Sequence, residues 1–544
     1  MKKYFLTLIA CLSAMAVAIA QNNMGIDYFL SGEISRAKEF FENQTSGNPG
    51  QANFYLGEIA LAEGKADAAK SYYEKGLAAA PGFALNKVGL AKLLLKSNPS
   101  EGSKQLAALA KDKNNRKDPE VIYAIAKTYR DNGMTDEMNK IINNSSYKSD
   151  LIYILRGDIY KDANNIGKAA AEYEQAIMKN PNFVVPYVKV AMIYMHINPR
   201  AAVDKLNELW STGSNHPLVA KFLAKAYYNM GAYDRANEIF KSFFNINTAS
   251  VEDITDYAAS LFFVEQYGES AALVDKGIVK DPDNFVLNRL RMYSAFETND
   301  YDAGIKTGEK FFSLPLKENK YIARDYLTYA ALLIFEKQPD KALEMYNYAL
   351  ELSEEKTPVY KQIGETLNKA GYPEKGAEYY EKYIAGLEEN ADAAEYFTLG
   401  QMFYRAATTA LQDTANINAA AEAEVFMSKG DKTFAVVAER SPDNYLGPIF
   451  RARINSLRDP DASRGLAKPY YEQALNILLS KEDALSKNKR EILEIYRYLS
   501  YYHYVQFDLN GKPEDKAQAI EISKKMLELD PANSVAVQLL EALQ

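Results

Sequence analysis

The sequence predicts an all-α fold, a right-handed α-solenoid of about 12–14 stacked helix-turn-helix units. Three observations support this fold class. Small and aromatic residues recur in a fixed order, this order returns about every 34 residues, and turn-forming residues separate the two halves of each unit. A single helix pair cannot bury its apolar face alone, so a run of such pairs is stable only as a stack.

The stretch LIYILRGDIYKDANNIGKAAAEYEQAIMKNPN, residues 151–182, shows the pattern in full. Tyr153, Gly157 and Tyr160 are spaced by four and three residues, so they share one face of a first helix. The second helix repeats this spacing at Ala169, Tyr173 and Ala176. The intervening DANN is turn material and Pro181 ends the second helix. The small residues therefore let two helices approach closely, and the tyrosines fill the space beside them.

The same order recurs along the chain. The small residue of each first helix serves as its marker, and successive markers lie 31 to 38 residues apart. The markers are Gly25, Gly57, Gly89, Ala126, Gly157, Ala191, Ala224, Ala258, Met292, Ala330, Gly364 and Gly400. This order of residue types resembles the tetratricopeptide repeat (TPR) family, whose unit is a helix-turn-helix, and the resemblance covers nearly all of the chain after residue 20.

The resemblance varies from unit to unit. It is strong at Gly57, Gly157, Ala224, Ala330 and Gly364. It is weak at the units of Gly89, Ala126 and Met292, where the alanine of the second helix is missing or displaced. An unrelated helical bundle, or another solenoid of helix pairs, is the alternative. The recurrence of ordered residue types, beyond apolar periodicity alone, favours the TPR-like reading.

Breaks in the pattern divide the array into three segments: 21–250, 251–390 and 391–544. Lengthened connections at 247–253 and 313–319 are expected points of bend. About eighteen residues are inserted at 411–428, and we expect a loop there, either a tolerated surface excursion or part of a binding face. The final stretch, SVAVQLLEALQ, is expected to form a helix that caps the exposed end of the stack.

The N-terminus reads as an export signal. Lys2 and Lys3 precede an uncharged apolar run that ends in the cleavage pattern Ala18-Ile19-Ala20, so residues 1–20 are expected to be removed. This placement predicts a periplasmic protein of a Gram-negative cell. Cys11, the one cysteine, follows Leu8-Ile9-Ala10, and a lipidated N-terminus at Cys11 with outer-membrane association is the alternative. No later stretch is apolar enough to span a bilayer.

No pattern of catalytic or metal-binding residues stands out. The three histidines, His196, His216 and His503, lie far apart and show no metal-ligand spacing. The formal net charge of −8 argues against a nucleic-acid groove, which needs clustered Lys and Arg. We therefore expect neither enzymatic activity nor a cofactor, and no nucleic-acid partner.

The TPR resemblance implies that first helices line a concave groove. Residues one position after the packed stripe, such as Asp158 and Lys161, point about 100° away from it and are expected to face that groove. Exposed aromatic and cationic side chains there suit recognition of a polypeptide. The candidate groove residues are Lys221, Lys225, Tyr228, Arg289, Tyr293, Phe296, Lys361 and Tyr404.

Two functions fit these observations. The first is a non-enzymatic scaffold or adaptor that binds a protein or peptide partner, in secretion, outer-membrane assembly or envelope biogenesis. The second is a glycan-binding component of a polysaccharide export or uptake apparatus, with groove tyrosines stacked on sugar rings. An arrangement in which these aromatics instead pack against neighbouring helices is the structural alternative to both.

Overall fold

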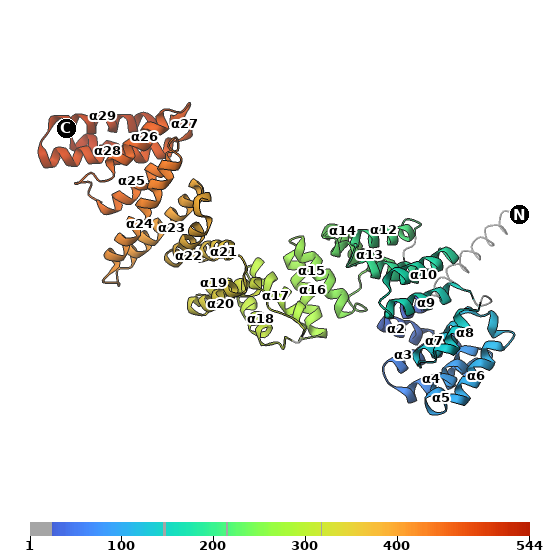
Figure 1. Ribbon diagram of the computed structural model, residues 1–544. Helices are drawn as coiled ribbons and strands as arrows, with labels where there is room; N and C mark the ends of the chain where they lie inside the picture. The colour runs from blue at the N-terminus through green and yellow to red at the C-terminus, as the bar shows by residue number, and fades with distance from the viewer. Residues whose placement is uncertain (1–23, 145–147, 214–215, 317) are drawn as a thin grey trace. The chain divides into compact units, whose positions relative to one another are not determined.

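The computed structural model describes residues 24–144, 148–213, 216–316 and 318–544. The expected signal segment, with Cys11 and Ala20, lies outside these residues. Within them every regular element is helical. Consecutive helices lie side by side in pairs, and short turns join the two helices of each pair, as Figure 1 shows. The prediction of an all-α solenoid of stacked helix pairs is confirmed.

The first helix of each pair begins the unit. The first helices are 24–30, α3 (Pro49–Ala62), α5 (Ala84–Ser97), α7 (Pro119–Asp131), α9 (Asp150–Asp162), α11 (Val184–Tyr194), α13 (Pro217–Asn229), α15 (Val251–Phe263), α17 (Phe285–Glu297), α19 (Ala323–Phe335), α21 (Thr357–Lys369), α23 (Ala393–Gln412), α25 (Leu446–Arg458) and α28 (Lys489–Asn510).

The second helices follow in the same order. They are α2 (Ile34–Gln44), α4 (Ala66–Ala79), α6 (Pro99–Lys111), α8 (Thr135–Ile142), α10 (Ile166–Lys179), α12 (Pro199–Trp210), α14 (Tyr233–Phe243), α16 (Tyr267–Lys280), α18 (Tyr301–Ser313), α20 (Pro339–Leu352), α22 (Pro373–Leu387), α24 (Ala419–Arg440), α26 (Lys468–Leu479) and α29 (Pro513–Leu529). The described chain thus contains fourteen pairs, within the predicted range.

Marker glycines set the distance between the helices of a pair. A Cβ built on Gly157 would lie 2.3 Å from Cε1 of Tyr173, and one on Gly57 would lie 2.3 Å from Cε1 of Tyr73. Both tyrosines are fully buried. The turn of the α9–α10 pair uses Asn164 at φ 56°, and the Asn165 side chain accepts a hydrogen bond from the Lys168 amide to cap α10.

The inserted residues at 411–428 are not a loop, so that expectation was wrong. They lengthen α23 and α24, which are joined by residues 413–418. Alanine and glutamate dominate residues 419–424, and both favour helix. Met427 and Ala423 are buried, whereas Ile417 in the connecting turn is 97% exposed. The insertion is therefore a two-helix extension of one pair.

The C-terminal helix α30 (Ser534–Ala542) packs on α28 and α29. Ala536, Leu539 and Leu543 are buried against the preceding pair. Asn533 caps the helix by accepting a hydrogen bond from the Ala536 amide.

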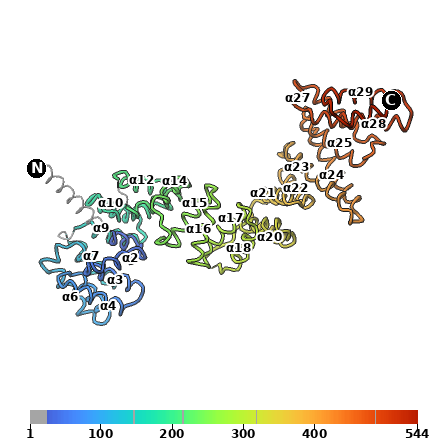
Figure 2. Tube along the Cα trace, turned by 180° about the vertical axis from the view of Figure 1, so that it is seen from behind, coloured from blue at the N-terminus to red at the C-terminus, as the bar shows by residue number. Residues whose placement is uncertain are grey.

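The chain separates into two compact units, residues 1–294 and 295–544. The boundary falls inside α17. This division is coarser than the three segments expected from the sequence, whose limits at 250 and 390 both fall between helix pairs. Figure 2 shows the same succession of pairs along the Cα trace. The candidate binding residues are described below within each unit separately.

Candidate binding surfaces

Asp158 follows the marker Gly157 and was expected to face a free groove. Instead it accepts a hydrogen bond from the Tyr173 hydroxyl at 2.6 Å and forms an ion pair with Lys189 Nζ at 2.8 Å. Tyr173 belongs to the same pair and Lys189 to the next. Burial and the Asp158 charge raise the pKa of the Tyr173 hydroxyl well above its ordinary value. Asp158 thus joins two consecutive units, while Lys161 remains exposed.

The same trio of tyrosine, carboxylate and cation recurs along the array. In each case the carboxylate accepts from a second-helix tyrosine and pairs with a cation on a first helix of the adjacent unit. The other trios are Tyr73–Glu58–Lys92, Tyr380–Glu395–Lys361 and Tyr471–Glu494–Arg453. The charged side chains of these trios therefore pair with one another between adjacent repeats. The sequence pattern did not reveal these contacts because the partners lie in different repeats.

Lys361, one of the candidate groove residues, belongs to such a trio. Its Nζ lies 3.1 Å from Glu395 Oε1. The hydrogen bond to Glu395 raises the pKa of the Lys361 ammonium, although the side chain is still about a third exposed. Two other candidates in the C-terminal compact unit, residues 295–544, pack against aromatic rings. Phe296 contacts Phe335, and Tyr404 contacts Phe450. None of these three lies against another of them.

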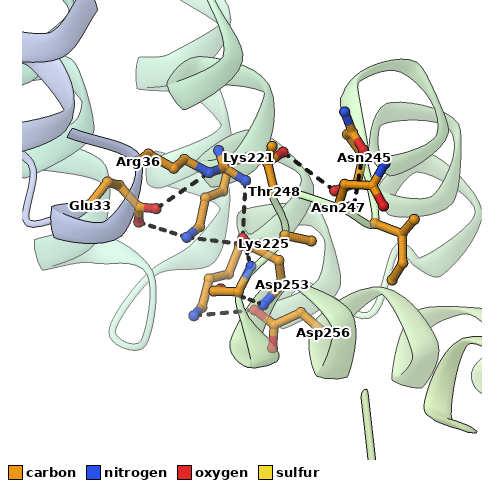
Figure 3. A network of polar contacts seen from close by, with 12 residues as sticks. Glu33, Arg36, Lys221, Lys225, Asn245, Asn247, Thr248, Asp253 and Asp256 are labelled. Carbon is orange, nitrogen blue, oxygen red and sulfur yellow. Dashed lines mark hydrogen bonds and ion pairs between the residues drawn. The ribbon is translucent and has the colours of Figure 1, made fainter. Parts of the chain in front are cut away.

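Lys221 and Lys225 lie in a network of ion pairs, shown in Figure 3. Lys221 is 4% exposed, and its Nζ lies 2.6 Å from Glu33 Oε1 and 2.9 Å from Asp253 Oδ1. Lys225 pairs with Glu252 and, at 3.2 Å, with Asp256. The expectation that Lys221 is an exposed groove cation was wrong, because three elements close around it.

Arg36 completes the network. Its Nη2 donates to Asp253 Oδ2 at 3.0 Å, so one carboxylate serves two cations. Burial alone would raise the pKa of Asp253, but Lys221 and Arg36 hold it below its ordinary value. Glu33 and Arg36 belong to the first helix pair, Lys221 lies on α13 and Asp253 on α15. The network therefore joins the first helix pair to the seventh and eighth pairs.

The loop before α15 fixes Asp253 in this position. Ser250 and Asp253 form a capping box: the Asp253 amide donates to the Ser250 hydroxyl, and the Ser250 amide donates to Asp253 Oδ2. Lys280 holds the loop from the other side by donating to the carbonyls of Ile246 and Ala249. The lengthened connection near 247–253 is therefore an ordered support for the network.

Tyr228 and Tyr293 belong to an aromatic cluster on the last pairs of the N-terminal unit, here termed the edge aromatic cluster. Tyr233 and Phe263 stack at 4.5 Å, and Tyr228 lies edge-on to Tyr233 at 5.4 Å. The cluster consists of Tyr228, Tyr233, Phe262, Phe263, Tyr267 and Tyr293. Burial raises the pKa of Tyr228 to about 12.

Exposure within this cluster is uneven. Tyr293 is buried and Phe263 is 46% exposed. A depression of about 470 Å³ adjoins Phe263 and Tyr233 and is lined with the charged side chains of Asp234, Arg235 and Glu265. Arg289, the remaining candidate, has its guanidinium 4.8 Å from the ring centroid of Phe285. Tyr228, predicted as a groove residue, lies in this cluster, whereas the sequence analysis did not single out Phe263 and Tyr233.

A second cavity lies where the first helices of the N-terminal unit begin; we term it the mouth pocket. It encloses about 440 Å³. Its apolar lining includes Ile26, Leu151, Phe183 and Val184, and its polar lining includes Asp27, Asp118, Glu120, Asp150, Asn180, Asn182 and His216. It therefore combines carboxylates from three separate helix pairs with an apolar wall.

Two carboxyl groups of the mouth pocket are poorly compensated. Burial raises the pKa of Glu120 to about 7, with Asp118 adding to the effect. Burial also raises the pKa of Asp27, despite His216 beside it. Glu120 does accept a hydrogen bond from the Tyr55 hydroxyl at 3.4 Å, but no cation in the described part of the chain pairs with it, whereas Asp118 caps α7 and Asp150 accepts from Asn180. Glu120 and Asp27 are the groups that a bound cation would stabilise.

His216 closes one side of the pocket. Its Nδ1 accepts a hydrogen bond from the Leu218 amide at 3.2 Å, which leaves the proton of the neutral ring on Nε2. That Nε2 lies 3.3 Å from Asp27 Oδ2. Sequence spacing could not associate these two residues, which are almost 190 positions apart.

Within the described residues, no helix is long and apolar enough to cross a membrane. The same part of the chain holds no group of three or more His, Cys, Asp or Glu side chains arranged to bind a metal ion.

Comparison with known proteins identifies repeats in this chain. The tetratricopeptide repeat model matches residues 50–83 and 151–183. No curated protein sequence matches the chain significantly. None of these comparisons indicates an enzyme family.

Solved structures resemble parts of the chain. The C-terminal part of a TPR repeat-containing protein from Cytophaga hutchinsonii is 28% identical, covers 53% of this chain and 99% of its own, and gives a TM-score of 0.40. A tetratricopeptide repeat protein from Parabacteroides merdae is 13% identical over 46% of this chain and 96% of its own, with a TM-score of 0.31. YrrB, described as a TPR protein with an unusual peptide-binding site, is 17% identical over 40% and 95%, with a TM-score of 0.26.

The matched segments coincide with structural units. Residues 50–83 span α3 and α4, and residues 151–183 span α9 and α10. These are the pairs in which Gly57 packs on Tyr73 and Gly157 on Tyr173. The chain is thus an α-helical solenoid that contains tetratricopeptide repeats.

Proposed function

We propose that this protein is a non-enzymatic scaffold that holds a basic segment of a polypeptide partner in the mouth pocket of its N-terminal unit. The tetratricopeptide fold itself indicates a protein–protein interaction scaffold. The observation that carries the finer proposal is the pairing of an apolar wall with two poorly compensated carboxyl groups, Asp27 and Glu120, in one cavity.

The chemistry of the pocket selects its occupant. A lysine or arginine side chain presents an aliphatic stem to Leu151 and Phe183 and a cation to the carboxylates. The cation would favour the ionised form of Glu120 and Asp27 and so recover the cost of their burial. An acidic segment would add like charge to the same site and is excluded by repulsion.

Titration of two fluorescent peptides tests the proposal. The probes are a lysine–alanine peptide of eight residues and its glutamate–alanine counterpart, followed by anisotropy at low salt. We expect saturable binding of the basic peptide alone, weakened at least about tenfold by Glu120→Gln, a loss of about 1.4 kcal/mol. Glu137→Gln, which removes a partly exposed carboxylate of α8 outside the mouth pocket, is the matched control. Equal binding by both variants would place the peptide elsewhere.

The cellular setting is part of the proposal. The basic, apolar and small-residue pattern of residues 1–20 supports export to the periplasm of a Gram-negative cell, with a role in secretion, outer-membrane assembly or envelope biogenesis. Intact mass of the protein from the periplasmic fraction tests this directly. A chain that begins at Gln21 is expected. A lipid-modified chain that begins at Cys11 would establish outer-membrane anchoring instead.

The edge aromatic cluster favours a second candidate function, glycan binding. Its partly exposed ring of Phe263 lies beside a depression with carboxylate and guanidinium groups, a combination that stacks on a sugar ring and bonds its hydroxyls. A glycan array with the wild type and with Phe263→Ala tests it. Saturable binding lost in Phe263→Ala supports this function. No binding to any glycan leaves the cluster with a packing role alone.

A further inference from the structure

The first helix pair of the N-terminal unit meets the seventh and eighth pairs across what we term the seam. On one side are the helix at 24–30 and α2, and on the other are α13 and α15. Two ion pairs cross it, Glu33–Lys221 and Arg36–Asp253, and Figure 3 shows both. The residues joined are 188 to 217 positions apart in the sequence. The seam therefore closes one turn of the solenoid on itself.

Contacts between consecutive pairs combine ion pairs, such as Glu58–Lys92, with extensive apolar packing. Consecutive pairs are joined by buried apolar side chains along whole helices, as at Gly57, Tyr73 and Gly89, where one tyrosine ring fills the space between three helices. At the seam, the ion pairs are accompanied by a 3.3 Å contact between His216 and Asp27 and by a ring contact between Tyr28 and His216 at 6.2 Å. An open pocket of about 300 Å³, lined by Tyr28, Arg36 and Pro217, lies beside them.

A contact held by buried ion pairs can exchange between a closed and an open form more readily than an apolar core can. Desolvation of the charges offsets much of their attraction, so the closed form gains little net free energy. On separation, Glu33 and Arg36 on one side and Lys221 and Asp253 on the other regain contact with water, while each keeps its partner on its own side. An apolar interface of similar extent would instead expose its surface to water, at a cost proportional to the area.

The mouth pocket lies on the seam. Ile26 and Asp27 line it from the first pair, and His216 lines it from the start of α13. Residues from α7, α9 and the approach to α11 complete the wall. If the first pair moved away from α13, the pocket would lose Asp27, one of the two carboxyl groups that attract a cation. The pocket is complete only in the closed form.

We propose that the first helix pair, residues 24–44, is a gate: its ion pairs with Lys221 and Asp253 hold it closed, and their release opens the mouth pocket. A bound basic segment contacts Asp27 as well as Glu120 and thereby stabilises the closed form. This consequence for binding rests on the proposed function, whereas the opening of the seam does not.

Distance measurement by pulsed electron spin resonance tests the gate without any ligand. Spin labels are attached at Glu42→Cys on α2 and Lys241→Cys on α14, both exposed, in the full chain carrying Cys11→Ser. The wild type is expected to show one narrow distance population. Arg36→Gln should add a population at longer distance that accounts for a substantial fraction of the molecules.

Lys38→Gln is the matched control, because Lys38 lies on the same helix but pairs with Glu63 of the next pair. Its distance distribution should match the wild type. If Arg36→Gln reduces the helical circular-dichroism signal, the milder Glu33→Gln, which keeps the Arg36–Asp253 pair, is measured in its place. Wild-type distributions in the seam variants that keep their helical content overturn the gate.

Adding the basic peptide separates the gate from the proposed function. In the seam variants, the peptide should return the long-distance population to the short one. If the seam variants open but the wild type does not bind the peptide, the gate is supported and the proposed function is refuted. Peptide binding that is equally tight in the wild type and in an opened variant refutes control of the pocket by the gate.

Discussion

The position after the marker glycine has a structural role that its sequence context conceals. Helical spacing predicts that its side chain points about 100° away from the packed stripe, so the sequence alone indicates an exposed groove residue. In the structure Asp158 bridges Tyr173 and Lys189, and Glu58 bridges Tyr73 and Lys92. The direction of the side chain is a local property of the helix, whereas its cationic partner is supplied by the next helix pair.

The marker glycine itself gives a prediction about stability. Gly157→Leu should lower the free energy of unfolding by about 1–3 kcal/mol, because even a Cβ there meets the Tyr173 ring at 2.3 Å. Lys161→Ala, at an exposed position of the same helix, should leave it nearly unchanged. Urea unfolding followed by circular dichroism measures both.

Gly167→Ala is the matched control for this change. A Cβ at Gly167 meets no atom within 4 Å, so alanine there should be neutral or stabilise α10 by up to about 1 kcal/mol. If Gly157→Leu proved harmless while Lys161→Ala destabilised the chain, the assignment of the two faces of α9 would be reversed.

Among the elements, α15 shows how a loop and a helix start position a charge. The capping box at Ser250 holds Asp253 in the network, where it serves Lys221 and Arg36. The neighbouring Glu252 pairs with Lys225 at the surface and is 62% exposed. The two acidic residues are adjacent in sequence but should differ strongly in their contribution to stability.

Asp253→Asn should cost about 1–3 kcal/mol of unfolding free energy, since it removes the carboxylate that Lys221 and Arg36 share, and opening of the first pair limits the loss by returning these cations to water. Glu252→Gln should cost less than about 1 kcal/mol, as expected for a solvent-exposed pair. Urea midpoints of the two variants, measured at pH 7, check the difference. Similar midpoints for both would show that the seam carries no special stabilisation.

The stabilisation by the Asp253 carboxylate should depend on pH. The pKa of Asp253 is lower in the folded chain than its ordinary 3.8, so its stabilising effect is complete above pH 3.8 and is lost as the pH falls through the folded value. The wild type should therefore lose stability below about pH 4 more steeply than Asp253→Asn does. Urea midpoints at pH 5 and pH 3 measure that difference, and parallel losses in both chains would contradict it.

The insertion at 411–428 shows why element boundaries were harder to predict than the repeat. The break in spacing was visible, but its interpretation as a loop ignored the strong helix-forming residues at 419–424. Those residues extend α24 by full turns, and Ala423 packs inside the lengthened pair. Local propensity decided the outcome at this point.

At the scale of the whole molecule, the repeat was predictable from the sequence. The contact of the first helix pair with the seventh and eighth pairs at the seam was not. The stack follows from residue types that recur within 12 to 38 positions, which a single sequence displays. The seam and the mouth pocket depend on pairs such as His216–Asp27 and Arg36–Asp253, which no periodicity links. Lys221 was picked out as a charged first-helix residue, but its burial required knowledge of what closes over it.

The pH dependence of binding follows from the mouth pocket. Glu120 has a pKa of about 7, above its ordinary 4.5, so it becomes ionised only as the pH rises through neutrality. Affinity for the lysine–alanine peptide should therefore increase by about three- to tenfold between pH 6 and pH 8. Calorimetric titration at both values measures this, and Glu120→Gln should flatten the response. Tighter binding at pH 6 would contradict the assignment.

The location of the bound segment tests the central claim most directly. A benzoylphenylalanine placed at Asn182, an exposed residue of the mouth pocket, is irradiated with the labelled lysine–alanine peptide, and Lys161 carries the same group as a control outside the pocket. The account predicts cross-linking at position 182 alone, abolished by excess unlabelled peptide and by Glu120→Gln. Equal cross-linking at both positions, or cross-linking unaffected by Glu120→Gln, would contradict it.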